Sequence, residues 1–455
     1  MKKVLLILVI AALLISFVGC GGALQEQPQA TTTTSSVTDT TTVESTDNTT
    51  QTTASTIGSA SVSKQPTSSS SVRQSTTTTT KTKPSKFTMH HYYQHSNYIE
   101  VRGGLKNTGY KIAQDGALQV AFMGGSVTNG MGSTNQSMGY RGRLLTHLRS
   151  TYNAVFSEID ASMGGNGSTY GVYFTEQFVA SKNPDLVFIE YAINNAHDGV
   201  KDAKTLWNHY ETMIHTIREA NPYADIVLLY VSNEANQSRD IVPILEEIAD
   251  KYQLVSVHLY QAIIDVIETR PGVQWSALYT DGSHPNDAGY DIMAGILKGM
   301  MEYALSMSPF TYQKMATPSA QSAIQTEAKA VMTSSLSKIP AGWQKVSNFS
   351  YASAGKLYNG CIQTTQTDKA ITVRFKGTDF GLLLEYAKDA GVLEYSVDGG
   401  AAQTLDCYLS YSNPKARLLL KDGADTEHTV TFQLKTGSRM AIAAFLLNGT
   451  ILSVE

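Results

Sequence analysis

Cysteine is scarce in this chain, with three in 455 residues, and their positions do not form a zinc-binding spacing. The sequence also lacks a phosphate-binding loop and a dinucleotide-binding glycine fingerprint. An excess of one charge is missing too: 35 Lys and Arg stand against 39 Asp and Glu, and no basic run marks a nucleic-acid binder. We therefore expect no metal, no cofactor and no nucleic-acid partner.

A hydrophobic run long enough to cross a membrane is also absent at the N-terminus. The apolar run Val4–Val18 follows Lys2 and Lys3 and is shorter than the roughly 20 residues that a span needs. It ends at Phe17-Val18-Gly19-Cys20, which resembles a bacterial lipobox, with Phe17 where Leu is usual. The resemblance implies a signal peptide at 1–19, a diacylglycerol on Cys20, and a protein anchored to the outer face of the bacterial cell membrane. A plain secretory signal is the alternative, and either predicts export.

Residues 20–86 are rich in Thr and Ser and poor in apolar side chains. Such a segment cannot bury enough surface to offset the entropy of ordering, so we expect a disordered linker.

Residues 87–310 alternate short apolar runs with helical patterns, which predicts a parallel sheet covered on both faces, a three-layer α/β/α fold of flavodoxin-like type. The expected strands are Leu118–Met123, Val155–Ile159, Leu186–Tyr191, Ile226–Val231 and Leu254–Leu259. The expected helices are Gly139–Tyr152, Tyr170–Ser181, Lys201–Ala220, Ile241–Tyr252 and Asp287–Leu305.

Residues 311–338 are rich in Ala, Ser and Thr and suggest a connector, partly helical. Residues 339–455 show short strand patterns separated by turns, which predicts an all-β sandwich of jelly-roll type. The expected strands are Ala370–Phe375, Gly381–Tyr386, Gly391–Val397, Arg417–Leu420, His428–Leu434 and Ile442–Leu447. Cys361 and Cys407 fall in this region, and they either form a disulfide or stay as two separate buried thiols.

Polar residues suited to acyl transfer follow several of the expected strands. Ser126 stands in the glycine-rich turn after the first strand, Gly165 lies in the loop after the second, and Asn194 follows the third. Asp281 and His284 share the last long loop before the final helix. Carboxyl ends of parallel strands meet at one edge, so these residues are expected to converge there. A Ser activated by a His that an Asp orients is the arrangement of a serine hydrolase.

This set of residues resembles the four motif blocks of the SGNH (GDSL-like) hydrolase family over about 220 residues. The resemblance assigns Ser126 as nucleophile, His284 as base and Asp281 as its partner. It assigns the backbone N–H groups of Ser126 and Gly165, with the Asn194 amide, as oxyanion donors. Gly125 stands where the family usually has Asp, while Ala192 and Asn195 replace the Gly and Asp of the third block. These departures bear on the substrate subgroup and on fine positioning.

The family and the export signal together predict an extracytoplasmic esterase that removes O-acetyl groups from a polysaccharide or oligosaccharide. The C-terminal strands look like accessory domains of carbohydrate esterases. Two alternatives remain open: a lipase or arylesterase acting on longer acyl chains, and an inactive cell-surface protein that binds glycans.

Three further groups of residues have an ordinary structural explanation beside a functional one. His90, His91 and His95 suggest a metal site but fit an extended surface segment better. His197 and Asp198 line the pocket or start a helix, and Trp275 and Tyr279 flank the substrate or anchor their loop.

Overall fold

The computed structural model describes residues 96–307, 309–347 and 360–455, all within one compact unit that begins at Thr76. The expected signal peptide, Cys20, the Thr/Ser-rich segment and the cluster of His90, His91 and His95 lie outside the described residues. In the described part, no helix has both the length and the hydrophobicity to cross a bilayer.

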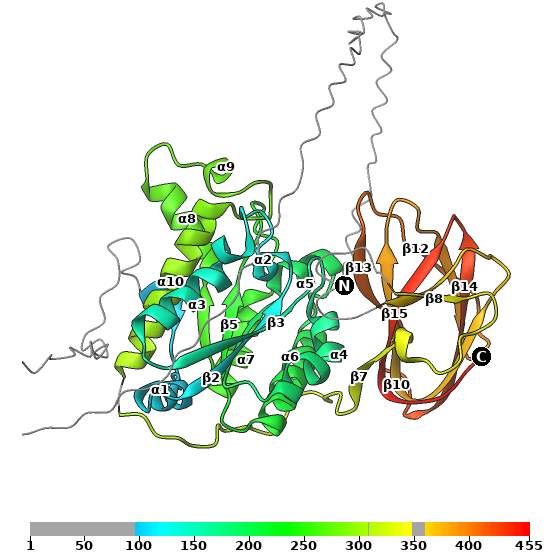
Figure 1. The fold of residues 1–455 in the computed structure, drawn as a ribbon, viewed down its shortest axis with the longest axis horizontal. Helices are drawn as coiled ribbons and strands as arrows, with labels where there is room; N and C mark the ends of the chain where they lie inside the picture. Colours follow the sequence, from blue (N-terminus) through cyan, green and yellow to red (C-terminus); the bar gives the residue numbers. More distant parts are fainter. Residues whose placement is uncertain (1–95, 308, 348–359) are drawn as a thin grey trace, which may run out of the picture. The chain divides into compact units, whose positions relative to one another are not determined.

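The first domain is built on a six-stranded sheet in the order β1-β6-β5-β4-β2-β3 (Figure 1). The strands are β1 (Ile99–Glu100), β2 (Ala117–Gly124), β3 (Val155–Ser162), β4 (Leu186–Glu190), β5 (Asp225–Tyr230) and β6 (Val255–His258). Strands β2 to β6 are parallel, and the short β1 pairs antiparallel with β6 at the edge. Along the sheet the parallel strands follow the order second, first, third, fourth, fifth, which is the flavodoxin-like topology. The predicted fold class is confirmed, and β1 is an addition to it.

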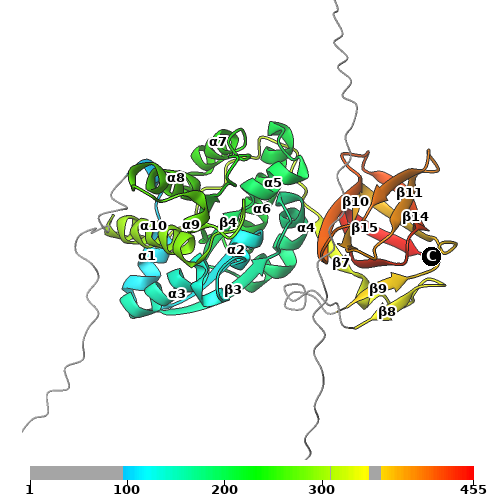
Figure 2. The same cartoon turned by 90° about the horizontal axis from the view of Figure 1, so that it is seen from above.

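Helices cover both faces of this sheet (Figures 1 and 2). Successive residues of a strand point to opposite faces, so β2 contributes to two cores. Val120 and Phe122 pack in the core shared with the first group of helices, and Ala121 and Met123 in the core shared with the second. The first group is α1 (Lys106–Ala113), α3 (Tyr140–Thr151), α8 (Leu259–Thr269) and α10 (Asp287–Ser306). The second is α4 (Ser168–Phe178), α6 (Ala203–Ala220) and α7 (Val242–Tyr252).

All five predicted helices are present, but several others were missed. The short α2 (Ser126–Asn129), α5 (Ala192–Asp198) and α9 (Trp275–Leu278) lie in loops near the carboxyl ends of the strands. Helix α8 was missed because it begins at Leu259, at the end of the apolar run that predicted strand β6. Periodicity alone does not separate two apolar elements that follow each other without a turn.

The second domain is an antiparallel β structure, as predicted. Its strands are β7 (Ala328–Met332), β8 (Gln344–Val346), β9 (Cys361–Thr364), β10 (Ile371–Tyr386), β11 (Val392–Val397), β12 (Gln403–Asp406), β13 (Asn413–Leu420), β14 (Thr426–Thr436) and β15 (Met440–Val454). They follow the order β12-β11-β14-β10-β15-β9-β8, with β13 paired to β10 and β7 paired to β15. The two long central strands, β10 and β15, pair along most of their lengths.

Two expected strands of this domain are one strand in the structure. Ala370–Phe375 and Gly381–Tyr386 both belong to β10, which pairs with β14 through its first half and with β13 through its second. The register shifts between Gly377 and Asp379, where Gly377 has a φ of +151° and a Cβ would overlap the carbonyl of Asn448. A glycine in that conformation allows a bulge that bends the strand. The sequence prediction ended one strand before this bend and began another after it.

The stretch 311–338, expected to be a partly helical connector, contains a strand. Strand β7 pairs antiparallel with β15, from Met332 opposite Ala444 to Ala328 opposite Asn448. Ala328, Ala330 and Met332 pack against the second hydrophobic core, which explains the alternation that a helix would not show.

Candidate active site

The turn that carries Ser126 is shaped by close packing around two glycines. Strand β2 ends at Gly124, Gly125 follows, and Ser126 is the first residue of the short helix α2. A Cβ on Gly124 would overlap the Thr128 hydroxyl, and a Cβ on Gly125 would overlap the side-chain carbonyl of Asn194. Both positions therefore need glycine, and the second explains why the family's usual Asp has no room here.

Glu190 lies beneath this turn, at the end of β4, and is completely buried. Its Oε2 accepts a hydrogen bond from the Thr128 hydroxyl (2.8 Å) and a longer one from the Gly125 N–H (3.4 Å). Burial raises the pKa of Glu190 to about 8, although these two contacts act in the opposite direction. The carboxyl group is therefore mostly neutral near pH 7.

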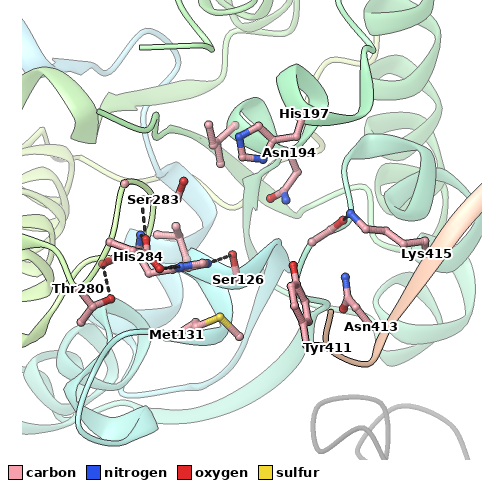
Figure 3. A pocket seen from close by; sticks show the side chains of 16 residues that line it. Ser126, Met131, Asn194, His197, Thr280, Ser283, His284, Tyr411, Asn413 and Lys415 are labelled. Carbon is pink, nitrogen blue, oxygen red and sulfur yellow. Dashed lines mark hydrogen bonds and ion pairs between the residues drawn. The ribbon is translucent and has the colours of Figure 1, made fainter. Parts of the chain in front are cut away.

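Ser126, His284 and Asp281 form a continuous hydrogen-bonded chain. Figure 3 shows the contact between Ser126 and His284. His284 Nε2 lies 2.9 Å from Ser126 Oγ, and His284 Nδ1 lies 2.7 Å from Asp281 Oδ2. The other Asp281 oxygen accepts from the backbone N–H groups of Ser283 (2.7 Å) and His284 (2.8 Å). Burial alone would raise the pKa of Asp281, but hydrogen bonds from the His284 ring and these backbone groups lower it below its usual value.

The loop that holds Asp281 and His284 is anchored by two aromatic side chains. Trp275 and Tyr279 stack with ring centroids 3.8 Å apart, and the Trp275 indole N–H donates to the Asp281 carbonyl (3.0 Å). Both rings are buried, and neither lines the pocket around Ser126 in the described part of the chain. Of the two explanations that the sequence left open, the structure supports the loop anchor.

Ser126 opens into a pocket of about 670 Å³, which is within the usual size range of small-molecule sites. Gly165, Asn194, Asp281 and His284 also line it, so the structure brings together all the residues that the sequence placed in the site. Asn194 Oδ1 is buried and has no hydrogen-bond partner among the described residues. Gly165 has a φ of +69°, a left-handed conformation that favours glycine.

His197 and Asp198 belong to the last turn of α5 rather than to a helix start. His197 lines the pocket, and burial, together with the positive charge of Lys415, lowers its pKa. Asp198 Oδ2 accepts from the Gly167 N–H (3.2 Å), and its Oδ1 lies 3.4 Å from the Arg417 guanidinium. Asp198 therefore ties the loop after β3 to the second domain.

Asn195, which stands where the family usually has Asp, binds the loop after β3. Its Oδ1 accepts from the backbone N–H (2.7 Å) and the hydroxyl (2.9 Å) of Ser168, at the start of α4. An amide oxygen fills this role as a carboxylate would, without placing a charge in a buried position.

Three of the pocket residues that sequence reasoning missed belong to the second domain. Tyr411, Asn413 and Lys415 line the pocket across from His284, with Ser126 between the two sides in Figure 3. Asn413 is buried, and its Oδ1 has no hydrogen-bond partner among the described residues. The only signal in the sequence was a polar residue at every second position before the apolar end of β13.

The two described cysteines, Cys361 and Cys407, are free and buried, so the disulfide alternative is wrong for this structure. They pack in different places: Cys361 faces the core shared with α4 and α6, and Cys407 faces the interior of the β domain. Burial raises the pKa of both thiols, to about 12 and about 11. The described residues contain no group of His, Cys, Asp and Glu side chains that is arranged to hold a metal ion.

Comparison with known proteins gives a matching family model and solved structures of similar fold. Residues 122–292 match the family model of the GDSL-like lipase/acylhydrolase family. A two-domain esterase active on acetylated mannans, crystallised with mannopentaose, superposes with a TM-score of 0.68 at 20% identity, covering 78% of this chain and 98% of that chain. A second crystal structure of a two-domain esterase active on acetylated mannans gives a TM-score of 0.67 at 19% identity, covering 80% and 100%. Both share the fold over the two domains, and no curated protein sequence matches this chain.

Proposed function

We propose that this chain, a carboxylic ester hydrolase by its GDSL-like lipase/acylhydrolase domain, removes O-acetyl or similarly short acyl groups from carbohydrate. The observation that carries the proposal is the chain of hydrogen bonds from Ser126 through His284 to Asp281, at the mouth of a pocket lined by both polar and apolar residues.

In the acylation step, His284 Nε2 takes the proton of Ser126 Oγ while that oxygen attacks the acyl carbonyl carbon. The carbonyl oxygen becomes an oxyanion, which accepts hydrogen bonds from the backbone N–H groups of Ser126 and Gly165 and from the Asn194 amide. The intermediate collapses with loss of the sugar oxygen, which takes the proton from His284. An acyl-enzyme on Ser126 and a free sugar hydroxyl result.

In the second step, water attacks the acyl-enzyme and gives its proton to His284. Collapse of the second intermediate releases the carboxylic acid, and the proton on His284 returns to Ser126 Oγ. Asp281 keeps the imidazole oriented through Nδ1 and stabilises its protonated form in both steps, which is the purpose of the 2.7 Å contact.

A carbohydrate substrate is supported by the lining of the pocket. Asn413, Lys415 and His197 contribute polar groups to it. Tyr411 is 59% exposed beside the pocket, where an aromatic ring can lie against a sugar face. Sugar hydroxyls donate and accept hydrogen bonds, and these polar groups of the lining can supply partners for them. The similar two-domain structures act on acetylated mannans, which agrees with this choice.

The test is acyl release by the chain from Thr76 onward, with Ser126→Ala as the matched variant. The substrates are p-nitrophenyl acetate, butyrate and octanoate, together with acetylated mannan, xylan and pectin. Acetate release from a glycan that disappears in Ser126→Ala is the expected result. A clear preference for octanoate would transfer the protein to the lipase class, and no turnover with retained glycan binding would support an inactive binding protein.

We also propose that the protein is exported and held on the outer face of the cell membrane by a lipid on Cys20. The support is the sequence Phe17-Val18-Gly19-Cys20 after a short apolar run with two lysines before it. Expression in a bacterial host with radiolabelled palmitate is expected to label the wild type and not Cys20→Ser. Equal labelling of the two, or none in the wild type, would refute lipid attachment at this residue.

A further inference from the structure

The loop after β3 carries Gly165, whose backbone N–H is an oxyanion donor in the proposed function, on which this inference rests. The peptide group that contains this N–H also contains the carbonyl of Gly164. Because a peptide group is planar, fixing the direction of the Gly164 carbonyl fixes the direction of the Gly165 N–H. The direction of the donor therefore depends on the hydrogen-bond partner of the Gly164 carbonyl.

The side chain of Asn166 holds it. Asn166 Nδ2 donates to the Gly164 carbonyl (3.0 Å) and also to the Pro414 carbonyl (2.7 Å), while Asn166 Oδ1 accepts from the Ala416 N–H (3.0 Å). The side chain is only 1% exposed and is not part of the pocket lining. The amide uses both its donors and its acceptor, so its orientation is fixed by three partners.

Two of these three partners belong to β13 of the second domain. Pro414 and Ala416 lie two residues apart, so their backbone groups point to the same edge of the strand. In the described residues β13 pairs with β10 and with no other strand. The Asn166 amide thus binds the free edge of β13, where the Pro414 carbonyl and the Ala416 N–H would otherwise be buried without hydrogen-bond partners.

The side chains of β13 meet the same loop. Asn413, Lys415 and Arg417 alternate along the strand and so share one face. The Lys415 ammonium donates to the Gly165 carbonyl and lies 3.8 Å from Asp198, which also binds the Gly167 N–H. A Cβ on Gly165 would overlap the Asn413 amide, so the strand also sets how close the loop approaches.

We propose that strand β13 takes part in catalysis. Asn166 and Lys415 hold the loop of Gly165 on this strand and so fix the direction of the Gly165 N–H, the oxyanion donor. The hydrogen bond from Asn166 Nδ2 to the Gly164 carbonyl also polarises that peptide and strengthens its N–H as a donor. Asn166 and Lys415 are positioning residues in this account, since they act through the backbone of the loop. The second domain therefore contributes to the chemical step itself, in addition to any contact with the sugar.

The test measures kcat and KM of the full chain on p-nitrophenyl acetate, a substrate too small to engage the outer pocket. Asn166→Ala is expected to lower kcat about 10- to 100-fold, somewhat less than complete loss of one oxyanion donor, and to leave KM within about twofold. Lys415→Met is expected to lower kcat in the same way. Lys421→Met is the matched control, because Lys421 follows the same strand and donates to Thr205 (2.7 Å) rather than to the loop; wild-type kcat is expected.

Inhibition by a boronic acid distinguishes a misplaced Gly165 N–H from a general loosening of the structure. Boronic acids form a tetrahedral adduct on an active serine, so their inhibition constant should rise in parallel with the loss of kcat in Asn166→Ala and Lys415→Met. Wild-type kcat in a folded Asn166→Ala variant would overturn the proposal, as would a loss confined to KM. If Asn166→Ala does not fold, Lys415→Met against Lys421→Met decides, and equal kcat in these two overturns it.

The same experiment distinguishes this inference from the proposed function. A wild-type enzyme that turns over esters, with Ser126→Ala inactive and Asn166→Ala and Lys415→Met unimpaired, refutes the role of β13 alone. A wild type that hydrolyses no ester refutes the proposed function, and the role of β13 with it.

Discussion

Replacing Glu190 by glutamine is expected to change how the stability of the protein depends on pH. Glu190 is fully buried beneath the turn of Ser126, and its Oε1 has no hydrogen-bond partner in the described part of the chain. An ionised carboxylate is costly in such a place, and burial accordingly raises the pKa from 4.5 to about 8. Glutamine has nearly the same shape and no charge at any pH.

The direction of the effect follows from proton binding. Below pH 4.5 Glu190 is protonated in both the folded and the unfolded chain, so its contribution to stability is fully present. Between pH 4.5 and 8 the unfolded chain loses this proton while the folded chain keeps it, and the free energy of unfolding falls as the pH rises. Each pKa unit corresponds to about 1.4 kcal/mol, so the raised pKa implies a loss on the order of 5 kcal/mol across this window.

The assay is urea unfolding of the wild type and Glu190→Gln at pH 5, 7 and 9. At pH 5 the variant is expected to be less stable by about 1–3 kcal/mol, because its amide buries an extra donor without a partner. At pH 9 the order reverses, since only the wild type carries the buried charge. Asp225, whose pKa burial raises to about 7, titrates in both proteins and so cancels in the difference. A stability difference that stays constant from pH 5 to pH 9 would refute the reasoning.

Three other predictions address the site and the thiols. Asp281→Asn is expected to lower kcat by about 10⁴-fold, because the imidazole loses the group that fixes its tautomer. The melting temperature is expected to stay unchanged, since the Asp281 side chain is 53% exposed, and a kcat within tenfold of wild type would contradict this role. Gly125→Ala is expected to push the Asn194 amide out of place and to lower kcat about 10²- to 10³-fold. Gly282→Ala, where a Cβ meets nothing within 4 Å, should leave kcat near wild type, and equal rates in the two variants would show that Asn194 is not a donor. Alkylation of the unfolded, unreduced protein with iodoacetamide is expected to modify both Cys361 and Cys407, as mass spectrometry of the peptides would show, and a peptide pair joined by a disulfide would contradict the structure.

The α/β domain could be predicted from the sequence because the patterns that indicate its strands and helices are local. Each buried strand is a short apolar run, and the polar residues that follow it must lie at the carboxyl edge of a parallel sheet. The residues expected at that edge line one pocket in the structure: Ser126, Gly165, Asn194, Asp281 and His284. The same reasoning left Asn166 unnoticed, since an asparagine between glycines is typical of any turn.

The contribution of the second domain could not be predicted in the same way. Alternation along β13 shows that Asn413, Lys415 and Arg417 share a face, but it does not show what covers that face. The partner of the face is a loop about 250 residues away in sequence, Gly164–Gly167, and such a distant contact leaves no periodic signal. The unused acceptor of Asn413 and the bonds of Asn166 become visible only when the two segments lie together.

The two domains share an apolar core, which is not expected if the β domain acts as an independent binding module. Residues of the β domain, among them Leu383, Ala416 and Ala443, are buried in the same hydrophobic core as Tyr173 and Met213 of the α/β domain. Domains that move freely meet through smaller and more polar surfaces, whereas a shared apolar core resists separation. An oxyanion donor is effective only if it is fixed before the substrate arrives, since reorganisation during the reaction would cost part of the stabilisation. If Gly165 is the donor we propose, the shared core behind β13 is what would keep its loop rigid, and the packing of the two domains would then have a catalytic consequence.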